Sequence, residues 1–275
     1  MISPATTPSG GVAMIYLSRG ADRGWRDLAR RFARSYAAHP AGIEHAAYVI
    51  YKDFACAADL AEARRTLAAV PHTELHPVGT NADIDAYLAV APDIPEQIVC
   101  FLNSHGEILG DFWLLKLWAN LCLPGIGMVG ATGSFEGPRE ANDAFPAFPN
   151  VHLRTTGFMI RRDDFATLLA GVTIADKAGA YRAESGIDGL TRRVLGQGLD
   201  IAVVGRDGRG HGPRWWPVSD TFRQATQSNL LIGDNHTRHY EAAPWQEKRA
   251  LVQWTWGDYR NDAVLRWPPE ATRRQ

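Results

Sequence analysis

Several short motifs that would reveal an activity directly are missing from this 275-residue sequence. The turns after its first predicted strands contain neither G-x-G-x-x-G nor G-x-x-x-x-G-K-[ST], so dinucleotide-binding and P-loop proteins lose support. H-E-x-x-H is absent, which argues against a metalloprotease, and G-x-S-x-G is absent, which argues against an α/β-hydrolase. A hydrolase or nucleotidyltransferase is therefore the weakest of the functions considered.

Cysteine, long apolar runs and excess charge are also scarce. The three cysteines, Cys56, Cys100 and Cys122, show no C-x-x-C spacing, which predicts reduced thiols in a cytoplasmic protein. No run of about 18 apolar residues predicts a membrane span, and the Pro-, Thr- and Ser-rich start does not resemble a signal peptide. A net charge of −1 gives no electrostatic reason to expect nucleic acid as a partner. We expect a cytoplasmic location, with the inner face of the membrane as an alternative.

The chemistry-bearing part of the sequence is centred on residues 97–134. A short apolar run at 98–102 predicts a strand that is buried on both faces. Asn103, Ser104 and His105 follow at once, and the carboxyl end of such a strand is where open α/β sheets bind ligands. Apolar residues at helical spacing in 111–122, a Pro-Gly break and a second apolar run at 127–130 complete a βαβ unit.

This stretch resembles the central segment of the family 2 glycosyltransferases of the GT-A fold. The resemblance is carried by the order FLNS, an acidic residue, WL, a helix, Pro-Gly and GxVGATGS, and it extends over about 12–208. It implies an α/β fold, a single GT-A-like (nucleotide-diphospho-sugar transferase) domain with a mixed, mostly parallel sheet flanked by helices, and a C-terminal extension. In that family the strand ends in a DxD-like motif that holds a divalent cation and the diphosphate of the sugar nucleotide. Here Asn103-Ser104-His105 stands in its place.

The resemblance and the predicted strand order together give a donor site. The carboxyl ends of the first, second and fourth strands would lie on one edge of the sheet and form a nucleotide crevice. The loop at 79–83 corresponds to the stretch that contacts base and ribose in the family, although Asp83 could equally complement a helix dipole. The residues expected to bind the donor are Ser18, Arg19, Lys52, Asp53, Asn81, Asp83, Asn103, Ser104 and Arg206.

A second candidate site lies at 181–193 and is similar to the acidic region of inverting family 2 enzymes. A sugar hydroxyl is a poor nucleophile until a positioned carboxylate accepts its proton, and the resemblance gives this role to Glu184, with Asp188 as the alternative. The structural alternative is a helix over 187–195 with Ser185 as its N-cap and Asp188 in its first turn.

The leaving nucleoside diphosphate must also be stabilised. The resemblance implies Mn²⁺ or Mg²⁺ held by Asn103, His105 and His211, because His and Asn can both ligate such ions. The alternative is metal-free neutralisation by arginines of the loop at 206–214.

We expect residues 1–10 to form a disordered lead and 11–214 to form the catalytic domain, with a nucleotide-binding half at 11–134 and an acceptor half at 135–214. Residues 215–275 would form a lid or extension packed on the same domain. The resemblance implies inverting transfer of a sugar from a nucleotide-sugar donor to a glycan or glycolipid acceptor. The context it implies is cell-surface polysaccharide or lipopolysaccharide assembly, and peripheral membrane association through the acceptor is one possibility. The alternative is a non-catalytic GT-A-like module that binds a nucleotide or glycan, and the loss of the DxD aspartates favours it.

Overall fold

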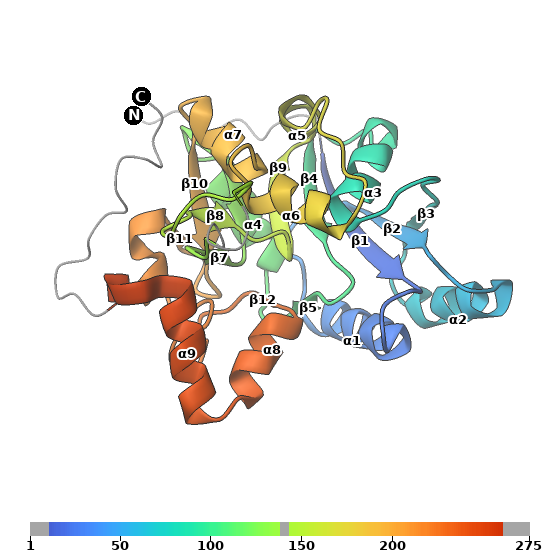
Figure 1. The fold of residues 1–275 in the computed structure, drawn as a ribbon. Helices are drawn as coiled ribbons and strands as arrows, with labels where there is room; N and C mark the ends of the chain where they lie inside the picture. The colour runs from blue at the N-terminus through green and yellow to red at the C-terminus, as the bar shows by residue number, and fades with distance from the viewer. Residues whose placement is uncertain (1–10, 138–142, 261–275) are drawn as a thin grey trace, which may run out of the picture.

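The structure, a computed structural model, describes residues 11–137 and 143–260 (Figure 1). The expected lead at 1–10 lies outside these residues, as do 138–142 and 261–275. The strands are β1 (Val12–Arg19), β2 (Ala46–Lys52), β3 (Thr73–Leu75), β4 (Ile98–Leu102), β5 (Glu107–Ile108), β6 (Ile126–Gly130), β7 (Gly133–Ser134), β8 (His152–Leu153), β9 (Gly157–Arg161), β10 (Asp200–Val204), β11 (Gly210–His211) and β12 (Ile232–Gly233). The helices are α1 (Trp25–Ala38), α2 (Ala57–Leu67), α3 (Asp83–Val90), α4 (Trp113–Leu121), α5 (Arg162–Leu168), α6 (Lys177–Ser185), α7 (Leu190–Gly196), α8 (Asn235–Ala242) and α9 (Trp245–Trp256), with short 3-10 turns η1 (Ala91–Asp93), η2 (Pro213–Val218) and η3 (Gly257–Arg260).

The main sheet has eight strands in the order β11-β10-β6-β9-β4-β1-β2-β3. The pairs β2–β3, β1–β2, β1–β4 and β6–β10 are parallel, whereas β9 runs antiparallel to both β4 and β6, and β11 runs antiparallel to β10. The predicted mixed, mostly parallel sheet is thereby confirmed. The chain leaves β1 toward β2 and later returns to β4 on the other side of β1, so the strand order reverses between β1 and β4, where open α/β sheets form a ligand crevice.

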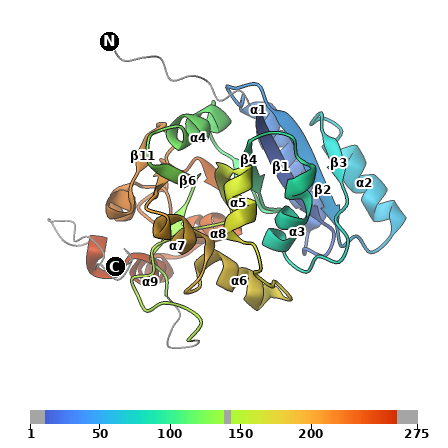
Figure 2. The ribbon, with the colours of Figure 1, turned by 90° about the horizontal axis from the view of Figure 1, so that it is seen from above.

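Two apolar clusters cover the two faces of this sheet. In β1, Ala13, Ile15 and Leu17 face the cluster that includes α3, α5 and α7, while the intervening residues face the cluster formed with α1, α2 and α4. This alternation follows from the two-residue repeat of a strand. Figure 2 shows the resulting layers, with α1 and α4 on one side of the strands and α3, α5, α6 and α7 on the other.

The C-terminal part of the chain is built into the same core. Trp216, Phe222 and Trp256 are fully buried and belong to the apolar cluster that also contains Ala13 and Ile15 of β1. The helices α8 and α9 then form a hairpin beside the sheet (Figure 1). None of the described helices is long and apolar enough to cross a membrane.

The structural alternative considered for 187–195, a helix capped by Ser185, is wrong. Ser185 does not cap the next helix, because it is the last residue of α6, whose N-cap is Asp176, which accepts a hydrogen bond from the Gly179 amide at 2.7 Å. A turn then separates α6 from α7, and a Cβ on Gly186 would lie 2.5 Å from the Arg182 carbonyl oxygen. A turn at Thr155 and Thr156 separates β8 from β9.

Candidate functional site

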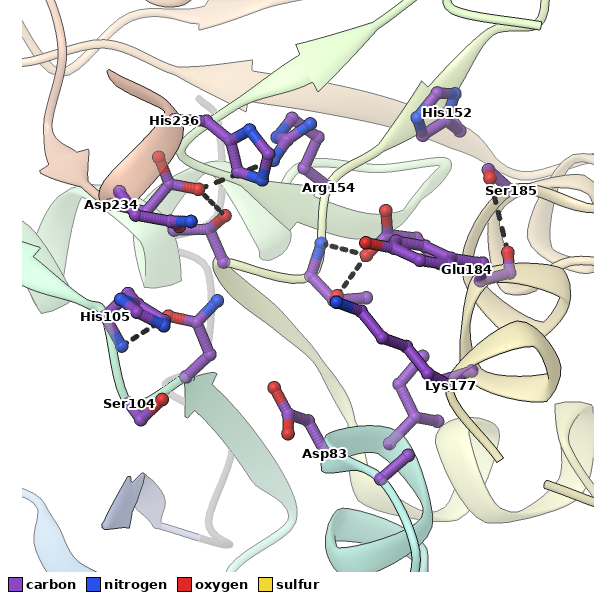
Figure 3. Close-up of a pocket in the computed structure, with 18 of the residues that line it drawn as sticks. Asp83, Ser104, His105, His152, Arg154, Lys177, Glu184, Ser185, Asp234 and His236 are labelled. Carbon is purple, nitrogen blue, oxygen red and sulfur yellow. Dashed lines mark hydrogen bonds and ion pairs between the residues drawn. The ribbon is translucent and has the colours of Figure 1, made fainter. Parts of the chain in front are cut away.

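A cavity of about 720 Å³ opens at the carboxyl ends of β1 and β4. Its volume lies within the range of small-molecule sites. One end is formed by the turns after β1 and β4 and by the start of α3, and the other by β8, α6 and the segment that leads into α8. Figure 3 shows charged and polar side chains converging on it from both ends. The cavity thus joins the two predicted halves of the chain.

Hydrogen bonds and ion pairs fix the end of the cavity at β1 and β4. The Ser104 hydroxyl donates to the Asp22 carboxylate, and the Tyr16 hydroxyl donates to the Ser104 carbonyl oxygen at 3.1 Å. Arg19 reaches Asp22 at 3.6 Å and also donates to Asp53 at 2.8 Å. These contacts hold the turn after β4 against the turn after β1.

Asn103 and His105 form a closed turn at the tip of β4. The side-chain oxygen of Asn103 accepts a hydrogen bond from the His105 amide at 3.1 Å, which is the local role that an aspartate would also play. Burial lowers the pKa of His105 below its ordinary value, and the imidazole is neutral at neutral pH.

Asp83, in the first turn of α3, faces the same end of the cavity (Figure 3). Burial, together with the negative charge of Asp22, raises the pKa of Asp83 to about 6. Asp83 thus lines the cavity and also stands in the first turn of α3, where a carboxylate can complement the helix dipole.

Glu184 lies on the opposite wall, on the face of α6 that lines the cavity. Its Oε2 accepts hydrogen bonds from both the amide and the hydroxyl of Thr155, the amide contact being 3.0 Å long. The turn between β8 and β9 therefore aims this carboxylate, and Figure 3 shows the two contacts as dashed lines.

His152 of β8 lines the cavity close to Glu184 and is only 4% exposed. Its Nδ1 donates to the Asn150 carbonyl oxygen at 2.9 Å. Burial lowers the pKa of His152 below its ordinary value, although the carboxylates of Glu184 and Glu136 act in the opposite direction. The neutral ring then carries its lone pair on Nε2.

A buried ion-pair network joins this wall to the C-terminal helices. Arg154 lies 3.7 Å from Glu136 and 3.4 Å from Asp234, and Arg223 pairs with Glu136. Burial raises the pKa of Asp234, but Arg154, the neighbouring His236 and hydrogen bonds outweigh it, and the pKa lies below its usual value. Asp234 is also the N-cap of α8, where it accepts the Thr237 amide at 2.8 Å.

Seven of the predicted site residues line this cavity: Arg19, Asn81, Asp83, Asn103, Ser104, His105 and Glu184. Six do not. Ser18 is buried in β1, and Lys52 is buried where it donates to the Thr80 carbonyl oxygen at 2.9 Å. Asp53 pairs with Arg19 outside the cavity lining.

The other three residues that do not line the cavity come from the second half of the chain. Asp188 is exposed in the turn before α7. Arg206 donates to the Leu230 carbonyl oxygen at 3.2 Å, and His211 lies in β11 at the far edge of the sheet. Arg206 follows β10 and His211 lies in β11, and the strands β6 and β9 separate both of these strands from β4 and β1 at the donor end.

The predicted metal ligands are therefore not brought together, because Asn103 and His105 line the cavity and His211 does not. Within 11–137 and 143–260, no three His, Cys, Asp or Glu side chains are grouped so that they could hold a metal ion. The side-chain oxygen of Asn103 is also engaged by the His105 amide. The side chains present do not fit a metal centre held by the protein alone.

Several lining residues were not predicted as site residues. The sequence could have indicated four of them, because they are polar residues that interrupt apolar or aromatic stretches: Arg154, Thr155, Asp234 and His236. No local sequence pattern indicates Glu136, Lys177 or Arg223, since each reaches the cavity only through the tertiary fold. Tyr181 and Trp254 also line the cavity and remain about half exposed, at 48% and 57%.

Comparisons with known proteins show a likeness of the fold only. No family model and no curated protein matches the sequence. The mannosyltransferase PcManGT of Pyrobaculum calidifontis, solved with GDP-Man and Mn²⁺, matches with a TM-score of 0.50 at 12% identity over 70% of this chain and 54% of that one. This chain thus spans about half of the mannosyltransferase's length.

Two further structures match less well. Mouse xyloside xylosyltransferase 1 gives a TM-score of 0.45 at 11% identity over 83% of this chain and 98% of that one. CMP:2-keto-3-deoxy-manno-octonic acid synthetase, solved with CTP, gives a TM-score of 0.44 at 11% identity over 70% of this chain and 88% of that one. Together with the sheet order, the likeness to the mannosyltransferase confirms a GT-A-like fold.

Proposed function

We propose that this chain is a glycosyltransferase that moves a sugar from a nucleotide-sugar donor to a hydroxyl acceptor with inversion at the anomeric carbon. The observation that carries the proposal is the single cavity that joins the carboxyl ends of β1 and β4 to the carboxylate of Glu184. The nucleotide binds at the end formed by Arg19, Asp83 and Asn103, and the acceptor at the end formed by β8 and α6. The family resemblance suggests cell-surface polysaccharide or lipopolysaccharide assembly as the context.

Glu184 acts as the general base in this proposal. Its Oε2 is held by Thr155, while its Oε1 makes no hydrogen bond with the residues that the structure describes. The acceptor hydroxyl gives its proton to this carboxylate as its oxygen bonds to the anomeric carbon. The bond from that carbon to the diphosphate oxygen breaks, and the electron pair leaves with the nucleoside diphosphate.

The leaving diphosphate needs positive charge close to it. Because the described side chains do not form a metal centre, we assign this role first to Lys177, on the wall that faces the donor end. Arg19 lines the donor end and adds to it, although Asp22 and Asp53 already offset part of its charge. No carboxylate of the described residues lies within ion-pair distance of the Lys177 ammonium. Arg206, which was predicted for this role, lies outside the cavity.

The experiment is a panel of UDP-, GDP-, CMP- and dTDP-sugars, with release of free nucleotide as the readout and proton NMR of the product for its anomeric configuration. Glu184→Gln keeps the size and polarity of the side chain but removes the base, and we expect transfer to fall by about a hundredfold or more. Asp27→Asn, on the exposed side of α1, is the matched control and keeps the wild-type rate. Release that is equally fast in Glu184→Gln, or a product with retained configuration, would refute an inverting mechanism based on Glu184.

A further inference from the structure

Three histidines of this protein share one local arrangement. In His45, His72 and His152, Nδ1 contacts the backbone carbonyl oxygen two residues earlier, of Ile43, Val70 and Asn150 respectively. Since a carbonyl can only accept, each neutral ring carries its proton on Nδ1 and its lone pair on Nε2. The backbone therefore fixes the tautomer at all three positions.

In two of the three, a hydroxyl group completes the arrangement. The Tyr36 hydroxyl lies 2.9 Å from Nε2 of His45, and the Tyr51 hydroxyl lies 3.0 Å from Nε2 of His72. Nε2 of His152 has no such partner among the residues that the structure describes, and the ring lines the cavity instead. The place that a tyrosine hydroxyl takes at the other two histidines is here open to a ligand.

The groups around His152 narrow down what that ligand can be. Glu184 on α6, Glu136 after β7 and Arg154 beyond β8 all interact electrostatically with its ring. Arg154 is already engaged by Glu136 and Asp234. A carboxylate or phosphate at Nε2 would meet a lone pair and two nearby negative charges, whereas an uncharged hydroxyl would find an acceptor.

We propose that His152 selects the acceptor substrate: its Nε2 accepts a hydrogen bond from a second, uncharged hydroxyl of a polyhydroxylated acceptor, while the reacting hydroxyl faces Glu184. This inference rests on the proposed function and adds to it the chemical class of the acceptor. Figure 3 shows His152 and Glu184 at the same end of the cavity, away from Ser104 and His105 at the donor end. His152 is thus an acceptor-binding residue, distinct from the donor site.

The test uses the full chain, saturated with whichever of UDP, GDP, CMP or dTDP binds it best in calorimetry. This complex is titrated at pH 7.5 with neutral methyl hexopyranosides and with the corresponding methyl hexuronides, which differ by one carboxylate. We expect at least one neutral glycoside to bind, and its hexuronide to bind at least tenfold more weakly. His152→Phe, which keeps a planar ring but has no acceptor, weakens neutral glycoside binding about tenfold and leaves nucleotide affinity unchanged.

His45→Phe is the matched control, because it removes the same ring arrangement outside the cavity and leaves glycoside affinity at the wild-type value. A conservative variant gives a second readout. His152→Gln keeps a side-chain hydrogen-bond acceptor, so it should retain more glycoside affinity than His152→Phe.

The possible failures are distinguishable. If a nucleotide binds but no neutral glycoside does, or if hexuronides bind better, the inference about the acceptor is wrong and the donor site stands. Wild-type glycoside affinity in folded His152→Phe also overturns it. If no nucleotide binds, both the proposed function and this inference fail.

Discussion

The amide of Thr155 donates to Oε2 of Glu184 at 3.0 Å, and the hydroxyl of the same threonine donates to the same oxygen. One residue in a two-residue turn between β8 and β9 thus aims the carboxylate on a separate helix. This contact joins two segments 29 residues apart in the sequence and determines which oxygen of Glu184 is free to act.

Removing the hydroxyl of Thr155 tests whether the orientation of the Glu184 carboxylate matters for the transfer reaction. We expect Thr155→Val to lower kcat for transfer by roughly tenfold, because the amide contact remains but the carboxylate gains freedom to rotate. Nucleotide affinity stays unchanged, since the donor end is separate. Thr66→Val, which removes a hydroxyl that donates to the Glu62 carbonyl oxygen in α2, is the control. An unaltered kcat in Thr155→Val would show that Glu184 does not depend on this turn.

Asp83 predicts a pH dependence of stability. Its pKa is raised to about 6 in the folded protein, above its ordinary value of 3.8, so the folded state binds the proton more tightly than the unfolded state. The free energy of unfolding that this group contributes is present below pH 4 and is lost as the pH rises to 6. Asp83→Asn should therefore be more stable than the wild type at pH 7, by roughly 1–3 kcal/mol, and should not be at pH 4. Urea unfolding at the two pH values measures this, and equal differences at both would contradict it.

Asp234 caps α8 and also pairs with the buried Arg154. Comparison with Asp176, which caps α6 without such a pair, separates the contributions of the cap and the ion pair to stability. Asp234→Ala should lower the free energy of unfolding by about 3–5 kcal/mol, because it leaves Arg154 buried without one of its partners. Asp176→Ala removes the N-cap of α6 only, where the side chain is more exposed, and should cost about 1 kcal/mol. Equal losses in urea unfolding would show that the pair with Arg154 contributes nothing.

The sequence predicts the first half of the molecule well because its signals are local. The apolar runs at 98–102 and 127–130 and the helical spacing at 111–122 correspond closely to β4, β6 and α4. The parallel order of β4, β1 and β2 brings Arg19 and Asn103 to one cavity. The resemblance also directed attention to Glu184, which does line the cavity.

The second half is harder because its site depends on tertiary contacts. Arg223 reaches the cavity from an irregular segment in which its own backbone has a φ of 48°, and no periodicity indicates such a position. His211 follows a strand in the sequence, as a site residue would, but β11 lies at the outer edge of the sheet. The strand order decides whether a residue at the end of a strand reaches the cavity, and the spacing of residues in the sequence does not determine that order.

The central claim is that the cavity at β1 and β4 binds a nucleotide. Calorimetric titration of the protein with UDP, GDP, CMP and dTDP, each with and without manganese, tests it most directly. We predict that one nucleotide binds with a stoichiometry of one and that Asp83→Ala weakens its binding. Binding persists without manganese because Lys177 and Arg19 supply positive charge. Binding only with manganese would contradict the assignment of charge stabilisation to Arg19 and Lys177, and no binding to any of the four would contradict the account as a whole.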